Sequence, residues 1–589
     1  MTHVREIRKE YKVNYKQVYE EWLRNPYFDT ETNFELESIK YNENEIKERF
    51  YKDLEFGTAG LRGIIGAGIN RMNKYVVRRA TQGLANYILI QGKESQGVAI
   101  AYDSRRKSTQ FAQEAALTLC ANGIKAYIFE SLRPTPELSF AVRHLGCVAG
   151  INVTASHNPP EYNGYKVYWE DGAQITPPHD AGIMREVAAV EDWATIRTMT
   201  KEQAVRAGLY HVIGKEVDDC YMEQLKKLVL HPECIKKWAD KLTIVYTPLH
   251  GTGNIPARRI LDEIGFKNVY VVPEQELPNG EFPTVSYPNP EAAEAFTLAL
   301  ALAKEKNADL VLATDPDADR LGVYVRDKKG EYHCLTGNMS GCLLADYEIG
   351  QMKALGQDIS DGSLIKTIVT TNMADAIAKY YDVNLIEVLT GFKYIGQQIL
   401  KMEETGKGKY LFGFEESYGC LIGTHARDKD AIVATMALCE AAAYYMDKGM
   451  TMWDAMVDLY ERMGYYMDGI QTISLPGVEG GEKIQQILSE LRANPPKEFD
   501  GYKVTSFRDY KMDTITDYKT GKVTPTGLPN SNVLYFDMED GVWLCVRPSG
   551  TEPKIKFYYG VKGKDLEDAK KLSDRLGEKV VEMIHKMIG

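Results

Sequence analysis

The chain has 589 residues, of which 44% are hydrophobic and 26% charged, a composition typical of a soluble globular protein. Its formal net charge of −12 argues against a general nucleic-acid binder, which would carry a basic face. The nine cysteines are scattered without a C-x-x-C pair, which argues against a disulfide framework or a zinc site and favours a reducing, cytoplasmic location.

No targeting or membrane segment is predicted. Residues 1–25 are charged throughout and lack the apolar core of a signal peptide. The longest apolar region, residues 431–446, contains Glu440 and is too short to cross a bilayer. We therefore expect an intracellular protein with neither a membrane nor a nucleic acid as partner.

An internal repeat indicates how most of the chain is built. The length predicts about four domains. Residues 121–136 (ANGIKAYIFESLRPTP) resemble residues 263–278 (EIGFKNVYVVPEQELP), and a fainter copy lies at residues 380–396. Each copy follows another strand-like run, with a helical segment between the two, which is typical of parallel sheets. We expect an α/β protein with three topologically related domains in tandem, whose sheets are mixed but mostly parallel.

The C-terminal region has a different pattern. Residues 532–561 contain three β-rich runs, and an amphipathic helix follows at residues 565–588. We expect a smaller α+β domain here, approached through a Gly/Pro-rich segment at about residues 462–500. The predicted divisions are an N-terminal helical extension at 1–45, domain 1 at 46–210, domain 2 at 211–328, domain 3 at 329–462 and domain 4 at 463–589.

Two candidate loops lie in the first α/β domain. FGTAGLRG (56–63) places Arg62 in a glycine-rich loop, although this motif taken alone favours a solvated charge. In INVTASHNPPEYNGYK (151–166), an apolar strand ends at Ser156 beside His157, and the Asn-Pro pair turns the chain at once. Open α/β sheets bind ligands at the carboxyl ends of their strands. Ser156 is therefore either a nucleophile or a turn residue.

The strongest local signal is ADLVLATDPDADRLG (308–322). Asp315, Asp317 and Asp319 follow an apolar strand at alternate positions. Three carboxylates so close together repel each other, and a divalent cation removes the conflict. All-oxygen ligands suit Mg²⁺ best. A solvated acidic turn is the alternative; an EF-hand is excluded because its sixth and twelfth positions would be Arg320 and Arg326.

Three loops of the third domain carry weaker signals. LFGFEESYG (411–419) ends an apolar run with Glu415, Glu416 and Ser417, acceptors that suit sugar hydroxyls but also a helix cap. TGFKYIG (390–396) adds Lys393, and THARDKDA (424–431) adds Arg427.

The C-terminal region contains VRPSGTEPKIKFY (546–558). Arg547, Ser549, Gly550 and Thr551 offer a guanidinium, two hydroxyls and loop amides, which together could clasp a phosphate. An ordinary hairpin loop is the alternative. Nucleotide binding is not supported, because no Walker loop occurs and GTGNIP (251–256) lacks the third glycine of a dinucleotide fingerprint.

With these loops together, the sequence closely resembles the α-D-phosphohexomutase superfamily, of the phosphoglucomutase and phosphomannomutase type, from roughly residue 45 to 575. TASHNP looks like the family's phosphoserine loop and DPDADR like its magnesium loop. GFEES looks like its sugar-specificity loop and RPSGTEP like its phosphate-binding loop. The resemblance implies four domains around a central cleft, Mg²⁺ as cofactor, and hexose 1- and 6-phosphates as substrates.

The resemblance also implies roles for the candidate residues. Ser156 would carry a phosphoryl group, with His157 and Lys166 as further catalytic candidates, and Mg²⁺ would be held by Ser156 and the three aspartates. The phosphoserine would convert the sugar monophosphate into glucose 1,6-bisphosphate, also the activator, and take back its other phosphate. The implied substrate-binding residues are Arg62, Arg320, Lys393, Glu415, Ser417, Arg427, Arg547, Ser549, Gly550 and Thr551.

One departure bears on the substrate. EESYGC places Cys420 where bacterial phosphomannomutase/phosphoglucomutases have a histidine, and its Glu-Glu-Ser form looks more like glucose-directed members. We therefore expect a phosphoglucomutase, monomeric or homodimeric. Phosphomannomutase, phosphopentomutase and bisphosphate synthase activities remain open alternatives. A metal-dependent phosphatase would release free phosphate, and a carbohydrate-binding protein would need neither Ser156 nor the aspartates.

Overall fold

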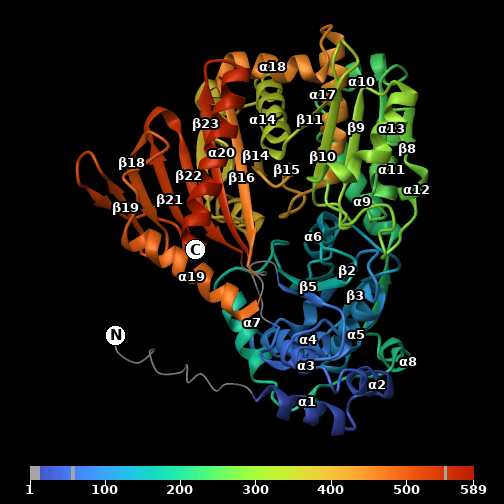
Figure 1. Ribbon diagram of the computed structural model, residues 1–589. Helices are drawn as coiled ribbons and strands as arrows, with labels where there is room; N and C mark the ends of the chain where they lie inside the picture. Colours follow the sequence, from blue (N-terminus) through green and yellow to red (C-terminus); the bar gives the residue numbers. More distant parts are fainter. Residues whose placement is uncertain (1–13, 55–59, 476, 550–553, 589) are drawn as a thin grey trace. The chain divides into compact units, whose positions relative to one another are not determined.

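The computed structural model describes residues 14–54, 60–475, 477–549 and 554–588. The chain forms two compact units (Figure 1). The first contains residues 1–218 and 278–288, and the second contains residues 219–277 and 289–589.

The first unit begins with three helices that have their own aromatic core. They are α1 (Tyr15–Arg24), α2 (Thr30–Ser38) and α3 (Glu43–Phe50). Trp22 stacks on Phe28 with 4.0 Å between ring centroids, and Phe50, Tyr75 and Trp193 meet Trp22 edge-on. Burying these rings fixes the short helices to the domain that follows, because helices of this length are marginal alone.

The rest of the first unit is built on a six-stranded sheet in the order β1-β5-β4-β2-β3-β6. Its strands are β1 (Leu61–Ile64), β2 (Val98–Tyr102), β3 (Ala126–Phe129), β4 (Ala149–Val153), β5 (Tyr162–Trp169) and β6 (Tyr210–Ile213). Its helices are α4 (Lys74–Ile90), α5 (Ser108–Ala121), α6 (Thr135–His144), α7 (His179–Ala188), α8 (Lys201–Arg206) and the start of α9 (Lys215–Lys226). β2 and β4 are buried at every residue, as expected for parallel strands covered on both faces.

The second unit contains two further α/β sheets. The strands of the first are β7 (Thr243–Thr247), β8 (Asn268–Val271), β9 (Leu310–Thr314), β10 (Leu321–Arg326) and β11 (Tyr332–Leu335). Those of the second are β12 (Gly362–Thr367), β13 (Asn384–Val388), β14 (Lys409–Glu415) and β15 (Gly419–Ile422). The helices are α10 (Pro232–Trp238), α11 (Asn254–Ile264), α12 (Pro273–Glu276), α13 (Thr297–Lys306), α14 (Gly337–Ala354), α15 (Met373–Tyr381), α16 (Phe392–Thr405), α17 (Ala431–Asp447) and α18 (Met452–Met463).

The three α/β sheets share one topology. In each, three parallel strands lie in the order third, first, second along the chain: β4-β2-β3, β9-β7-β8 and β14-β12-β13. An antiparallel strand (β5, β10 or β15) pairs outside each third strand. The expectation of three topologically related α/β domains is confirmed. The Ser156, aspartate and Glu415 loops occupy the equivalent connection, between the third strand and the antiparallel one.

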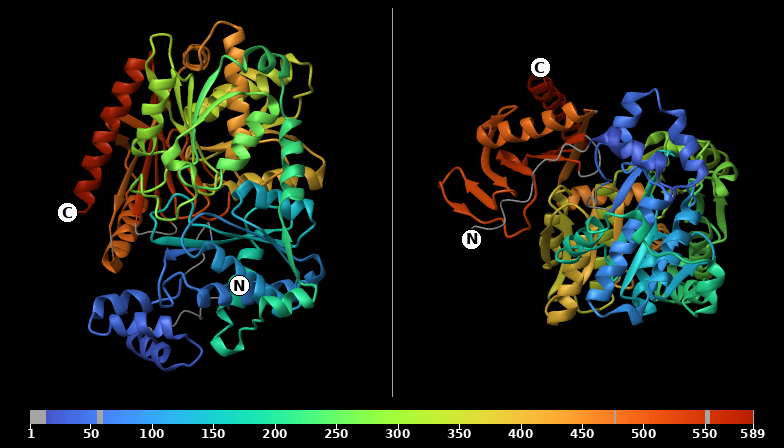
Figure 2. Two further views of the ribbon diagram at one scale, coloured as in Figure 1. Left: turned by 90° about the vertical axis from the view of Figure 1, so that its right-hand side faces the viewer. Right: turned by 90° about the horizontal axis from the view of Figure 1, so that it is seen from below.

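The C-terminal domain is an antiparallel sheet, as the predicted α+β class requires. Its strands are β16 (Tyr465–Ser474), β17 (Glu498–Phe499), β18 (Tyr502–Asp509), β19 (Thr514–Asp517), β20 (Val523–Thr524), β21 (Leu534–Met538), β22 (Trp543–Pro548) and β23 (Lys554–Gly563). Helices α19 (Gly477–Ala493) and α20 (Leu566–Ile588) pack their apolar residues into the same core as the sheet, and α20 runs along it in Figure 2.

The interpretation of residues 462–500 as an approach segment was wrong. This region contains the ten-residue strand β16 and the whole of α19. A helical pattern is present in the sequence, since Ile484, Ile487, Leu488 and Leu491 recur at helical spacing, and these side chains are buried. The glycines at the start of α19 obscured this pattern.

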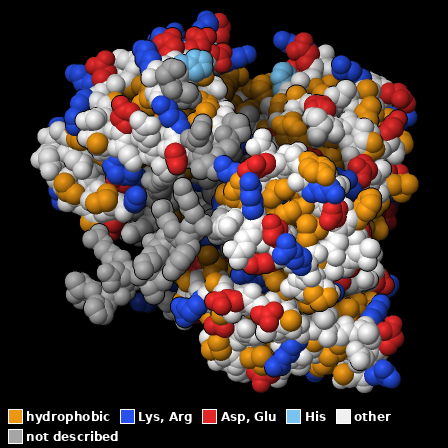
Figure 3. Space-filling model, turned by 60° about the horizontal axis from the view of Figure 1, so that its bottom comes forward, with side chains coloured by type: hydrophobic (Ala, Val, Ile, Leu, Met, Phe, Trp, Pro, Cys, Tyr) orange, Lys and Arg blue, Asp and Glu red, His pale blue; other side chains and the backbone are white. Residues whose placement is uncertain are grey.

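The distribution of charged side chains and the character of the helices are as the amino-acid composition predicts. Acidic and basic side chains are interspersed on the face drawn in Figure 3. Among the described helices, none combines the length and apolar character that a bilayer crossing requires. The predicted domain boundaries and the central cleft stay predictions.

Candidate active site

Ser156 lies in the connection from β4 to β5, here called the serine loop (154–161). Its φ of +50° is left-handed, a region that few residues other than glycine adopt. Its N–H donates to Thr154 Oγ1 at 2.8 Å, and its Oγ lies 3.2 Å from His157 Nδ1. A hydroxyl beside an imidazole at a strained strand end is suited to nucleophilic chemistry.

Neighbouring residues hold the serine loop. Arg62, in β1, donates from Nη1 to Asn158 Oδ1 at 2.8 Å. The Thr154 hydroxyl donates to the buried Asp103 carboxylate at 2.7 Å. Lys166 is buried in β5, where it pairs in register with Asn152 of β4. The structure therefore brings His157 to Ser156 and Arg62 to Asn158 of the same loop, and places Lys166 on the adjoining strand. The functional roles of these residues stay predictions.

The three aspartates lie between β9 and β10, in the aspartate loop (315–320). All three are buried, and one carboxylate oxygen from each lies within 4.8 Å of the others. Asp315 Oδ1 accepts the N–H groups of Asp319 and Arg320, both at 3.1 Å, which closes the loop. Three converging hard oxygen donors fit Mg²⁺, which prefers such ligands and leaves positions open for phosphate. The residues present are therefore suited to a magnesium ion.

Two cationic side chains balance this negative charge. Lys429 Nζ lies 3.2 Å from Asp319 Oδ2 and 2.9 Å from Asp428 Oδ1. Burial opposes the charged form of Lys429, but the carboxylates, led by Asp319, outweigh it and raise the pKa of the ammonium. Arg320 pairs with Glu291 at 2.6 Å, and its Nε lies 3.8 Å from Asp319.

Sequence reasoning missed Lys429. The signal was present, since the Asp430 side chain caps α17 by accepting the N–H groups of Ile432 and Val433. Aspartate is a favoured N-cap residue, and recognising this cap would have marked Lys429 as a loop residue beside the predicted site.

Glu415 ends β14, and it begins the glutamate loop (415–418). Its Oε1 accepts the N–H of Gly391 at 2.9 Å, which joins this loop to the start of α16, the helix that contains Lys393. Leu321, the residue that follows the aspartate loop, donates its N–H to Tyr418 O at 2.9 Å. This hydrogen bond joins the glutamate loop to the end of the aspartate loop. Burial raises the pKa of the Glu415 carboxyl.

Arg427 is completely buried. Its guanidinium donates to the backbone oxygens of Thr424 and Ala426 and pairs with Glu403. The protein's own groups therefore engage this side chain, and its binding of substrate stays a prediction. Ser417 is half-buried in the glutamate loop, and Lys393 is buried at the start of α16.

Arg547 lies on β22, which forms a hairpin with β23. Arg547 and Lys556 are directly paired across the two strands, and the Ser549 N–H donates to Lys554 O at 2.7 Å. Burial lowers the pKa of Lys556, as removing an ammonium from water does. Two cations side by side suit a phosphate dianion. Sequence reasoning missed Lys556, which the hairpin register could have revealed; the predicted Gly550 and Thr551 lie outside the described residues.

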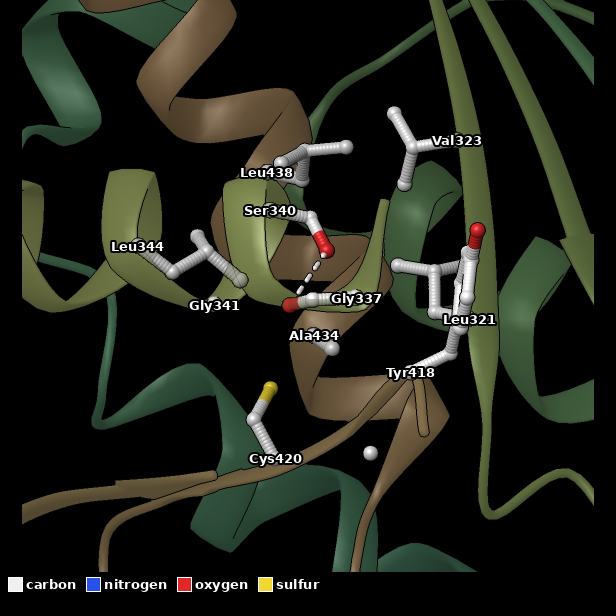
Figure 4. A pocket seen from close by; sticks show the side chains of 11 residues that line it. Leu321, Val323, Gly337, Ser340, Gly341, Leu344, Tyr418, Cys420, Ala434 and Leu438 are labelled. Atoms are coloured by element: carbon white, nitrogen blue, oxygen red, sulfur yellow. Dashed lines mark hydrogen bonds between the residues drawn. The ribbon is translucent and has the colours of Figure 1, made fainter. Parts of the chain in front are cut away.

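A small cavity lies beside the glutamate loop, and Tyr418 of that loop is among its lining residues. Figure 4 shows its apolar lining, with Leu321, Leu344 and Leu438 around it and Tyr418 and Cys420 from the region of the glutamate loop. The one hydrogen bond drawn joins Ser340 Oγ to Gly337 O at 3.4 Å. An apolar lining does not suit a sugar phosphate.

Four family models match along the chain. They describe the α/β/α domains I, II and III and the C-terminal domain of phosphoglucomutase/phosphomannomutase, and match residues 53–193, 219–330, 336–463 and 487–578. The chain belongs to this family. It is therefore a phosphohexomutase, an isomerase of the four-domain type, and the resemblance drawn from the loops is confirmed. The superfamily is typically magnesium-dependent, which agrees with the aspartate loop.

Relatives of known name or structure agree with this membership. The phosphoglucomutase of Staphylococcus aureus strain MSSA476 is 37% identical over 524 residues, covering 89% of this chain and 92% of that protein. A phosphoglucomutase/phosphomannomutase family protein from Burkholderia thailandensis has a TM-score of 0.62 at 19% identity, covering 90% of this chain and 97% of that one. Parafusin from Paramecium, in an open form, has a TM-score of 0.65 at 18% identity, with coverages of 90% and 95%. The two structures show a common fold.

Proposed function

We propose that this phosphohexomutase is a phosphoglucomutase that interconverts α-D-glucose 1-phosphate and glucose 6-phosphate. The observation that carries the choice of glucose is the 37% identity to the S. aureus phosphoglucomutase over 89% of this chain. The Glu-Glu-Ser sequence of the glutamate loop supports the same choice.

In this proposal Ser156 carries the phosphoryl group between the two ends of the sugar. Phosphoserine donates its group to the free hydroxyl of the sugar monophosphate, which gives glucose 1,6-bisphosphate and a free serine. The bisphosphate, bound in the opposite orientation, then returns its other phosphoryl group to Ser156. A covalent intermediate divides one difficult transfer into two easier ones. The position of His157 Nδ1, 3.2 Å from Ser156 Oγ, supports a role in moving the hydroxyl proton.

The other residues bind and orient the substrate. Glu415 and Ser417 accept hydrogen bonds from sugar hydroxyls, and the Arg547 hairpin, with Lys556, holds the phosphate that does not react. Lys429 keeps positive charge beside Asp319, and Arg62 steadies the loop that carries phosphoserine. Mg²⁺ would be held by Asp315, Asp317, Asp319 and the phosphoryl group of Ser156. The ion would supply positive charge that offsets the negative charge of the transferring phosphoryl group. Lys166, Lys393 and Arg427 complete the proposed site.

An initial-rate assay tests the proposal. Glucose 1-phosphate, mannose 1-phosphate and ribose 1-phosphate are each supplied with Mg²⁺ and a trace of glucose 1,6-bisphosphate, and free phosphate is followed in parallel. We expect rapid glucose 6-phosphate formation without phosphate release. The Ser156→Ala variant should lose the activity, whereas Ser489→Ala, which alters an exposed serine of α19, should keep it.

Each other outcome has a defined meaning. A faster reaction with ribose or mannose phosphate would keep the mechanism and replace the substrate. Phosphate release without isomerisation would identify a phosphatase and refute the mutase assignment. Full activity in Ser156→Ala would refute the phosphoserine mechanism.

A further inference from the structure

Arg105 makes an unusual set of contacts with the serine loop. Its guanidinium donates to the backbone oxygens of Ser156 at 2.5 Å, Pro159 at 2.8 Å and Tyr162 at 3.2 Å, and also to that of Asn158. The side chain is fully buried. One planar cation therefore gathers four carbonyl oxygens from the segment that begins at Ser156, which only the fork geometry of arginine allows.

Asp103 extends this contact to the other side of Ser156. Its carboxylate lies 3.4 Å from Arg105 Nε and accepts the Arg105 N–H at 3.0 Å. The same carboxylate accepts the hydroxyl of Thr154, and Thr154 Oγ1 in turn accepts the Ser156 N–H. The backbone of Ser156 is thus held at both ends, through Thr154 at its N–H and through Arg105 at its carbonyl oxygen.

A distant part of the sequence covers the guanidinium. Phe282 belongs to residues 278–288, here called the strap, which are part of the first unit although the sequence on either side of them belongs to the second. The Arg105 guanidinium carbon lies 5.0 Å from the centroid of the buried Phe282 ring. An arginine stacked on an aromatic face gains a cation–π attraction, which is stronger when both are removed from water.

At Gly280 the strap lies so close to the backbone around Arg105 that any residue larger than glycine would clash. A Cβ on Gly280 would lie 2.6 Å from the backbone nitrogen of Arg106 and 2.9 Å from the oxygen of Ser104. The adjacent Glu281 pairs with Arg106 at 3.3 Å, but the side chain of Arg106 is 47% exposed. The close backbone fit sets where the Phe282 ring lies.

We infer that Arg105 is a positioning residue that keeps Ser156 in its left-handed conformation, and that Phe282 of the strap keeps the Arg105 guanidinium in place. Rotation of Ser156 into an ordinary backbone region would turn its carbonyl away from Arg105 and leave a buried oxygen without that donor. The fold therefore offsets the strain at Ser156 with contacts made beside it. The consequence for phosphoryl transfer rests on the proposed function, since a misplacement of about 1 Å can cost about 100-fold in rate.

The test compares Arg105→Lys, Phe282→Leu and the control Arg106→Lys. Lysine keeps the charge but cannot reach four carbonyls from one ammonium. Each protein is mixed with glucose 1,6-bisphosphate and Mg²⁺, and the rate of Ser156 phosphorylation is followed by intact mass. We expect a loss of about 100-fold in Arg105→Lys, a smaller loss in Phe282→Leu and the smallest in Arg106→Lys, because the exposed Arg106 guanidinium donates to only one oxygen of the serine loop, Pro160 O, at 3.3 Å. The loss should appear in kcat, with KM for glucose 1-phosphate unchanged.

A crystal structure of Arg105→Lys provides a second measurement that does not depend on the reaction. We expect the φ of Ser156 to leave the left-handed region. A retained φ near +50°, equal rates in Arg105→Lys and Arg106→Lys, or a parallel fall in kcat, substrate affinity and melting temperature would each overturn the inference. If wild-type Ser156 accepts no phosphoryl group, the proposed function fails, and the crystal structure still decides the role of Arg105.

Discussion

Glu348 of α14 is a carboxyl group in an unfavourable place. It is 1% exposed, and within the part of the chain that the structure describes neither of its oxygens has a hydrogen-bond partner. A second buried carboxyl, Glu440 of α17, interacts with it electrostatically. Burial, and then the charge of Glu440, raise the pKa of Glu348 well above its ordinary value of 4.5.

This shift makes stability depend on pH. Because its pKa is raised, Glu348 keeps its proton to higher pH in the folded protein than in the unfolded chain, which releases it as the pH rises above 4.5. The contribution of Glu348 to stability is therefore complete below the pKa that it has in the unfolded chain. This contribution is lost as the pH rises toward the higher pKa that Glu348 has in the folded protein. While the folded carboxyl stays protonated, the loss amounts to about 1.4 kcal/mol per pH unit.

Glu348→Gln removes the titration and keeps the shape of the side chain. Relative to wild type, the variant should gain about 3 kcal/mol between about pH 5.5 and about pH 7.5, from the slope above. The measurement is the melting temperature of both proteins across this range, since a chain with several domains is not expected to unfold in one step. The difference between variant and wild type should grow with pH.

Glu404→Gln is the matched control, because Glu404 is an exposed glutamate in α16. Its melting temperatures should run parallel to those of wild type. Parallel curves for Glu348→Gln as well would show that the buried carboxyl is ionised in the folded protein or has a partner, and would refute the reasoning.

Three further predictions concern the site. Asp319→Asn should weaken Mg²⁺ binding more than about tenfold by calorimetry, because outer contacts alone already change metal affinity by that amount; unchanged affinity would remove Asp319 from the metal site. Gly251→Ala should also weaken Mg²⁺ binding and lower activity, since its Cβ would lie 2.5 Å from the Cα of Pro316 in the aspartate loop, whereas Gly481→Ala, where a Cβ meets nothing within 4 Å, should do neither. Finally, burial raises the pKa of Glu415, so its carboxyl becomes a charged acceptor at both oxygens only at higher pH. The kcat/KM should therefore rise with pH through that pKa, and Glu415→Gln should flatten this limb; an unchanged profile would contradict a role for its ionised form.

The sequence by itself determined the features that local patterns encode. The apolar runs that became β2 and β9 predicted buried parallel strands, because a strand covered on both faces needs no polar alternation. Their repetition along the chain predicted three related domains. The chemistry of each loop was also readable, since the three aspartates and the Ser156–His157 pair lie within a few residues of one another.

Only the tertiary structure decided which separate segments meet. Lys429 lies beside Asp319, and Phe282 lies over Arg105, although each pair is far apart in the sequence. Strand register similarly placed Lys556 opposite Arg547. No local periodicity specifies such contacts, because they depend on how elements with ordinary individual patterns pack together. The sequence therefore predicted the reacting groups, and the packing of the folded chain decided which charges and rings hold them in place.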